Sequence, residues 1–121
     1  MTLESIIMCL ALNVFYEANT EPELGQLAVA HVTMNRAQHH KQNVCKVVYA
    51  SKQFSWTSQE DLRKPSREDL KEARKIASLV IAGQTKDPTN GATYFHHVKV
   101  HPRWKKLKRT VQIGNHIFYK K

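Results

Sequence analysis

The repeat of apolar residues along this chain changes once, near the turn-forming segment 87–91 (DPTNG). Before this segment the apolar residues recur at helical spacing, and after it they follow the shorter period of strands. The pattern predicts helices over residues 2–18, 23–38, 44–49 and 66–83, and strands over residues 92–97, 110–113 and 116–119 with a turn at Gly114-Asn115. Ser66 and Asp69 are spaced as a capping box for the last helix. We therefore expect an α+β fold in which a helical lobe faces a small antiparallel sheet across a cleft.

The length and charge of the chain limit its organisation and its partners. At 121 residues, with no visible linker or repeat, residues 1–121 are expected to form a single domain. Nineteen Lys and Arg against ten Asp and Glu give a net charge of +9, which indicates an anionic partner. The first of these bases is Arg36. No acid follows Asp87, whereas many bases do: Lys99, Arg103, Lys105, Lys106, Lys108, Arg109, Lys120 and Lys121.

The basic segment from Lys99 to Arg109, which includes Trp104, leaves a nucleic-acid-binding module open as an alternative. Nothing resembling a helix-turn-helix, a zinc finger or an RNA-binding signature accompanies the segment, so we expect no nucleic acid partner.

The apolar run from Ile6 to Phe15 does not have the features of a targeting segment. It lacks a basic leader, follows Glu4, and precedes Asn19-Thr20-Glu21 rather than a small-residue cleavage site. It is also too short to span a bilayer. We therefore expect synthesis in the cytoplasm without a signal peptide, and no membrane anchor.

Neither cysteine is expected to be paired or reactive. Cys9 falls in the first predicted helix and Cys45 in an apolar stretch, so both are interpreted as small buried thiols. Cys45 and Ser55 also lack the sequence context of a thiol protease or a nucleophile elbow, which argues against covalent nucleophilic catalysis.

Glu17 is the strongest candidate for a catalytic group. Leu3, Ile7, Leu10 and Val14 form an apolar row along the first predicted helix, and one more step of three residues reaches Glu17. A carboxyl group in that poorly solvated position would have its pKa raised from about 4.3 toward the value of about 6 that suits a general acid. If the helix frays early, Glu17 would instead be a solvated carboxylate.

Aromatic and histidine side chains supply further candidates at the cleft. The irregular stretch 50–65 is expected to present Phe54 and Trp56 in a loop, where exposed rings can bind a ligand. The histidines show no metal-binding spacing, and adjacent His96 and His97 would point to opposite faces of a strand, so we expect no metal and no other cofactor. His96 and His116 are expected to support a hydrogen-bond network.

A series of ordered motifs resembles the SleB/CwlJ-type cell wall hydrolase family, which includes the catalytic domain of spore cortex-lytic enzymes. The resemblance covers nearly the whole chain. The motifs are residues 10–18 (LALNVFYEA), 21–22 (EP), 25–30 (GQLAVA), 35–36 (NR), 43–45 (NVC), 47–49 (VVY), 53–56 (QFSW), 76–77 (IA) with Gly83, 87–89 (DPT), 91–96 (GATYFH) and 113–119 (IGNHIFY). One departure is Asn19-Thr20, where the family commonly has Arg-Gly after Glu-Ala.

The resemblance implies a peptidoglycan-cleaving domain of lysozyme-like α+β character in which Glu17, of the Tyr-Glu-Ala motif, is the key acid. The resemblance implies peptidoglycan glycan strands as the substrate. The positive C-terminal third is expected to attract anionic wall polymers, and the protein is expected to act as a monomer. The absence of an export signal favours, by analogy, a phage endolysin that reaches the wall or periplasm after release. The candidate supporting residues are Glu21, Phe54, Ser55, Trp56, Thr93, Tyr94, His96, Asn115, His116 and Tyr119.

The number of nearby carboxyl groups decides between two mechanisms. A glycoside hydrolase needs two acids, about 5–5.5 Å or about 6.5–9.5 Å apart. Only Glu21 is local to Glu17, while Glu60, Asp61 and Asp87 lie in polar loops. We therefore favour a lytic transglycosylase that uses one glutamate to cleave the MurNAc-GlcNAc bond. A two-carboxylate muramidase or glucosaminidase, and a non-catalytic wall-binding module, stay open as alternatives.

Overall fold

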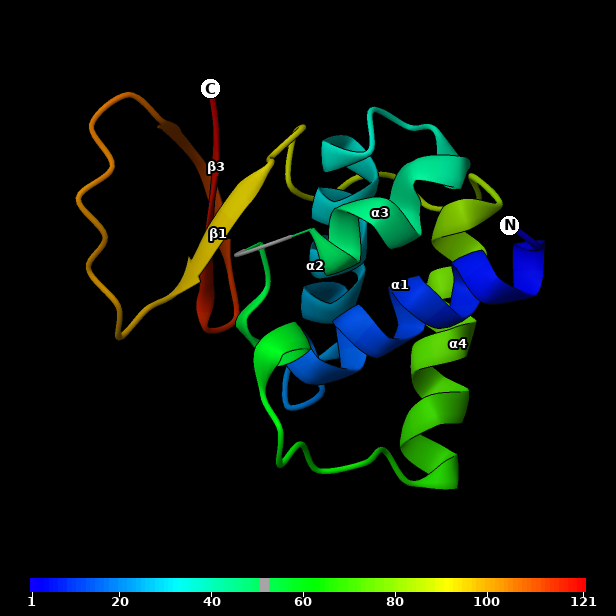
Figure 1. Ribbon diagram of the computed structural model, residues 1–121. Coiled ribbons are helices and arrows are strands. Elements are labelled where there is room, and N and C mark those ends of the chain that lie inside the picture. The colour runs from blue at the N-terminus through cyan, green and yellow to red at the C-terminus, as the bar shows by residue number, and fades with distance from the viewer. Residues whose placement is uncertain (51–52) are drawn as a thin grey trace.

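A computed structural model describes residues 1–50 and 53–121, and shows four α-helices and a three-stranded sheet in the described residues (Figure 1). The elements follow in the order α1 (Leu3–Ala18), α2 (Glu23–Arg36), η1 (Lys41–Asn43), α3 (Val44–Tyr49), η2 (Ser55–Ser58), α4 (Arg67–Ile81), β1 (Tyr94–His97), β2 (Lys108–Ile113) and β3 (His116–Lys120). The expected α+β fold is confirmed, because every predicted helix and strand is present with boundaries shifted by at most two residues. Within these described ranges, no helix is both long and apolar enough to cross a membrane.

Local chemistry accounts for the ends of the most regular helix. Ser66 Oγ accepts a hydrogen bond from the Asp69 amide at 3.0 Å, and Asp69 Oδ2 accepts one from the Ser66 amide at 3.3 Å. This is the predicted capping box, and it satisfies amide groups that have no partner within α4. Beyond the other end, Gly83 has a φ of 71°, a left-handed conformation that glycine adopts without a Cβ clash.

The helical lobe packs around α1, which contacts α2, α3 and α4. Leu10 and Val14 are fully buried, as their spacing predicts, but Leu3 is 52% exposed and Ile6 occupies the core instead. The buried stripe of α1 therefore begins at Ile6, whereas the predicted row begins at Leu3. The row still reaches Glu17, which is half-buried in the last turn of α1.

The sheet has the strand order β1-β3-β2 with both pairs antiparallel. Its inner face carries Phe118 and Ile113, which pack with Ala28 and Val32 of α2. This small cluster joins the sheet to the helical lobe, and Figure 1 shows the sheet beside α2 with the long β1–β2 connection on the far side. The outer face carries a separate aromatic group, formed by Tyr94, His96, Trp104 and Tyr119.

The prediction that the cysteines are free thiols is wrong, because Cys9 and Cys45 form a disulfide between α1 and α3. Their Cα atoms lie 5.3 Å apart, within the range that a disulfide requires. Their separation of 36 residues gives no sign of this pairing. It results from the packing of α3 against α1, which hydrophobic spacing does not specify.

Candidate active site

Glu17 lines a pocket of about 260 Å³ beside the C-terminal end of α1. Burial raises the pKa of its carboxyl group, while the nearby charge of Arg36 acts in the opposite direction. The net upward shift keeps a larger fraction of Glu17 protonated near neutral pH, as a general acid requires. The other residues that line this pocket are Phe15, Tyr16, Asn19, Ser55, Trp56, Gln59, Asp61, Leu62 and Arg63.

Arg36 is a site residue that no pattern in the sequence singled out. It ends α2, and its Nε donates a hydrogen bond of 2.6 Å to the carbonyl oxygen of Thr93, just before β1. Its guanidinium lies 4.7 Å from the centre of the Phe54 ring, in the range of a cation–π contact. Burial lowers the pKa of Arg36, and Tyr94 and Glu17 raise it. The only signals in the sequence were its place in the Asn35-Arg36 motif and its position as the first base of the chain.

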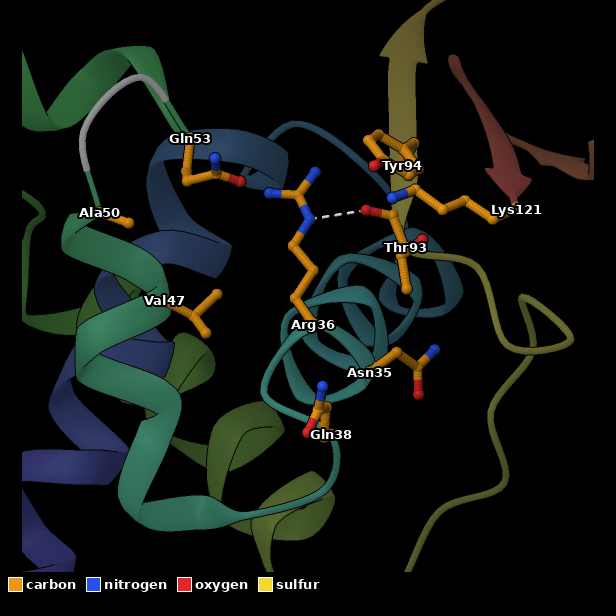
Figure 2. A pocket seen from close by; sticks show the side chains of 9 residues that line it. All are labelled: Asn35, Arg36, Gln38, Val47, Ala50, Gln53, Thr93, Tyr94 and Lys121. Atoms are coloured by element: carbon orange, nitrogen blue, oxygen red, sulfur yellow. Dashed lines mark hydrogen bonds between the residues drawn. The ribbon is translucent and has the colours of Figure 1, made fainter. Parts of the chain in front are cut away.

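A second pocket of about 360 Å³ is lined by Arg36 and lies between the helical lobe and β1 (Figure 2). Its lining residues come from α2, α3, the segment before β1 and the C-terminal end of the described chain: Asn35, Arg36, Gln38, Val47, Ala50, Gln53, Thr93, Tyr94 and Lys121. The segment 53–56 contributes to both pockets, because Gln53 lines the Arg36 pocket and Ser55 and Trp56 line the Glu17 pocket. The charge of Arg36 also acts on Glu17.

The predicted exposure of Phe54 and Trp56 is wrong, since only 3% and 7% of these side chains are exposed. The Trp56 ring stacks on Tyr16 with centroids 4.7 Å apart, and its Nε1 donates to Asn13 Oδ1 at 2.7 Å. Contacts with Asn13 and Tyr16 of α1 therefore keep Trp56 buried. Residues 55–58 form the short helix η2 instead of irregular chain. Trp56 still lines the Glu17 pocket beside exposed Ser55, whereas Phe54 lies under Arg36.

Glu21, Asn115 and His116 meet away from both pockets. Only 7% of Glu21 is exposed, and it accepts hydrogen bonds from the Asn115 amide at 2.8 Å and from Asn115 Nδ2 at 3.1 Å. His116 Nδ1 lies 4.0 Å from Glu21, but burial lowers the pKa of His116 despite that carboxylate, which favours the neutral ring. A Cβ at Gly114, whose φ is 57°, would collide with Glu21. Glu21 therefore attaches the β2–β3 hairpin to the α1–α2 turn.

The remaining predicted residues lie along the sheet, and Tyr94 belongs both to the Arg36 pocket and to the aromatic group of the outer face. Thr93 and Tyr94 line the Arg36 pocket at the start of β1. His96 and Tyr119 lie on the outer face, where His96 Nε2 and the Tyr119 hydroxyl are 2.9 Å apart. His96 and His97 do point to opposite sides, since His97 contacts the ring of His116 instead. The structure thus brings together only part of the predicted set around Glu17 and Arg36.

Asp61 is the one carboxyl group, besides Glu17, among the residues that line the Glu17 pocket. It is exposed in the segment after η2. Asp87 does not line this pocket, and its carboxylate accepts hydrogen bonds from Thr89, Gly91 and Asn35. Within residues 1–50 and 53–121, no group of three or more His, Cys, Asp or Glu side chains is arranged to hold a metal ion.

Comparisons with known proteins agree on one family. A family model described as Cell Wall Hydrolase matches residues 20–119. The crystal structure of the catalytic domain of the Bacillus cereus SleB protein has 29% sequence identity and a TM-score of 0.77, with 99% of this chain and 93% of that chain covered. The catalytic domain of the germination-specific lytic transglycosylase SleB from Bacillus anthracis has 27% identity and a TM-score of 0.75, with 98% and 97% covered. No curated protein matches the sequence significantly.

Proposed function

The chain belongs to the cell wall hydrolase family, and from this premise we propose that it cleaves the MurNAc-GlcNAc bond of peptidoglycan as a lytic transglycosylase, with Glu17 as its catalytic acid. The observation that carries the proposal is the position of Glu17. It is half-buried and lines a pocket, and burial raises the pKa of its carboxyl group. One of the similar structures is itself named a lytic transglycosylase, which supports the same reaction for this chain.

The proposed reaction uses one carboxyl group twice. Protonated Glu17 donates its proton to the glycosidic oxygen, and the bond from that oxygen to C1 of the muramic acid breaks. The resulting Glu17 carboxylate then accepts the proton of the 6-hydroxyl of the same sugar while O6 bonds to C1. The product carries a 1,6-anhydro ring, Glu17 is protonated again, and no water is consumed. The positive charge of Arg36 stabilises the carboxylate between the two steps.

Asp61 is the specific observation that favours the alternative, a two-carboxylate hydrolase. It shares the pocket with Glu17 and could activate a water molecule there. Its side chain is exposed, and no hydrogen bond to a described residue holds it in place, which suits a base less well than a held carboxylate. Glu21 is a weaker second acid than the sequence indicates, because both of its oxygens accept hydrogen bonds from Asn115.

The test is mass spectrometry of the soluble fragments released from purified peptidoglycan. We expect muropeptides with anhydro-muramic ends, lighter by one water than their hydrated counterparts. Glu17→Gln should lower the rate by about 10²–10⁴-fold, the usual contribution of a general acid, without loss of fold by circular dichroism. Asp61→Asn should act like Glu60→Gln, a matched change in a neighbouring exposed carboxylate that does not line the pocket.

Three results would contradict the proposal in different ways. Reducing muramic or glucosamine ends together with an inactive Asp61→Asn variant would establish the hydrolase. Full activity of Glu17→Gln would remove Glu17 from its role. Sedimentation with peptidoglycan without released fragments would indicate a wall-binding module.

We also propose the setting of this activity. The bases that follow Asp87 would attract the protein to anionic wall polymers, so wall binding should weaken as salt concentration rises. A disulfide is more usual in oxidising compartments, and the Cys9–Cys45 bond therefore favours action outside the cytoplasm. The proposed role as a phage endolysin predicts lysis of intact host cells only after their inner membrane is permeabilised.

A further inference from the structure

The pocket beside Arg36 has the charge and polarity of an anion site. Its described lining residues include two cationic side chains, those of Arg36 and Lys121, and no acidic side chain. The amides of Asn35 and Gln53 add neutral polar groups. Figure 2 shows the Arg36 guanidinium between Gln53 and Thr93, with the Lys121 side chain extending toward the same space.

Arg36 has donor capacity that the described structure does not use. Its Nε donates to the Thr93 carbonyl, but its Nη1 is buried and has no hydrogen-bond partner among the described residues. A buried donor without a partner costs free energy, and an acceptor that reaches the guanidinium recovers it. A carboxylate suits the group best, since the planar fork of an arginine can donate two parallel hydrogen bonds to it.

The position of Arg36 limits where such a carboxylate can come from. The charge of the same guanidinium acts on Glu17, and Gln53 of this pocket is separated by only one residue in the sequence from Ser55 of the Glu17 pocket, so one ligand strand can extend over both. Each peptide-bearing muramic acid of a glycan strand carries its stem peptide next to that bond, and stem peptides contain free carboxylates. A phosphate polymer offers the same charge, but it need not be attached to the sugar at the cleavage point.

We propose that the pocket lined by Arg36, Lys121 and Gln53 is a subsite for a stem-peptide carboxylate of the strand positioned at Glu17. This inference rests on the proposed function, because it assumes a peptidoglycan substrate. Binding of the carboxylate would orient the muramic acid and hold the glycosidic oxygen near the acid. The enzyme would then prefer strands with charged stem peptides over strands whose carboxylates are neutralised.

The test measures binding without turnover, so that it does not depend on activity. The Glu17→Gln variant is titrated with a soluble muropeptide and with the same muropeptide after its carboxyl groups are converted to carboxamides, which removes charge with little change of shape. We expect amidation to weaken binding by about tenfold or more, as loss of a charge-assisted hydrogen bond would. Isothermal titration calorimetry supplies both dissociation constants.

Lys121 and Lys120 provide a matched pair of variants in the Glu17→Gln background. Both changes to Gln remove one charge at the same end of the chain, but only Lys121 lines the pocket, whereas Lys120 lies near the Asn90 carbonyl. We expect Lys121→Gln to reduce the preference for the charged muropeptide by at least about threefold and Lys120→Gln to leave it unchanged.

Each outcome has a distinct meaning. Equal binding of the charged and amidated muropeptides overturns the subsite, while anhydro products from the unmodified enzyme would still support the proposed function. Equal effects of the two lysine variants would replace the subsite with general charge attraction. Displacement of the charged muropeptide by a glycerol phosphate polymer, with no effect of amidation, would assign the pocket to phosphate. Absence of any muropeptide binding would overturn the subsite, and digestion with the unmodified enzyme would decide the proposed function separately.

Discussion

Replacing Glu21 with Gln separates a structural role of this buried acid from a catalytic one. Glu21 Oε1 accepts from the Asn115 amide at 2.8 Å, and Oε2 accepts from Asn115 Nδ2 at 3.1 Å. In Glu21→Gln the remaining carbonyl oxygen can keep the first bond. The NH₂ group that replaces Oε2 at position 21 then faces Asn115 Nδ2, which is also a donor, until the side-chain amide of Asn115 flips to present its oxygen.

The expected cost follows from this exchange. Hydrogen bonds to a charged group contribute about 1.5–3 kcal/mol each, whereas neutral ones contribute about 0.5–1.5 kcal/mol. The substitution leaves a neutral acceptor for the hydrogen bond from the Asn115 backbone amide, and it replaces the acceptor of the hydrogen bond from Asn115 Nδ2 with a donor. We therefore expect the free energy of unfolding to fall by about 1.5–3 kcal/mol, nearer the lower value because exposed Asn115 can turn its amide.

Urea unfolding followed by circular dichroism measures this change, with Glu60→Gln as an exposed control. The rate per folded molecule, measured at a temperature where both variants are fully folded, should match the unmodified enzyme within about threefold, because Glu21 lines neither pocket near Glu17. An unfolding free energy equal to that of Glu60→Gln would refute the structural role. A fully folded Glu21→Gln variant as inactive as Glu17→Gln would make Glu21 the second catalytic carboxylate.

Three other changes test other parts of the structure. Arg36→Gln removes a charge that lowers the pKa of Glu17, so the pH at which activity falls on the alkaline side should move upward; a downward shift in the pH–rate profile would contradict this sign. The double change Cys9→Ser, Cys45→Ser opens a loop of 36 residues and should lower the free energy of unfolding by about 4 kcal/mol. A reductant should have the same effect on the unmodified protein and none on the double variant. Ser66→Ala removes the α4 cap and should cost about 1 kcal/mol in urea unfolding, and no measurable cost would mean that water replaces the cap.

The candidate site was only partly predictable. Glu17 followed from its place at the end of an apolar row, and its raised pKa agrees with that reasoning. Arg36 did not follow, because its importance depends on the Thr93 carbonyl and the Phe54 ring, which lie far away in the sequence. Trp56 was expected in solvent, since nothing in its local sequence shows that Asn13 would accept its indole hydrogen bond.

By itself the sequence determined the elements, their order and the fold class, because hydrophobic period, caps and turn residues act over a few neighbouring positions. The capping box of Ser66 and Asp69 and the change to strands after Gly91 are examples. Only the tertiary structure decided which distant residues meet, as in the Cys9–Cys45 disulfide and the attachment of Asn115 to Glu21. Periodicity shows which face of an element is apolar, but the partner of that face is set by how all the elements pack together.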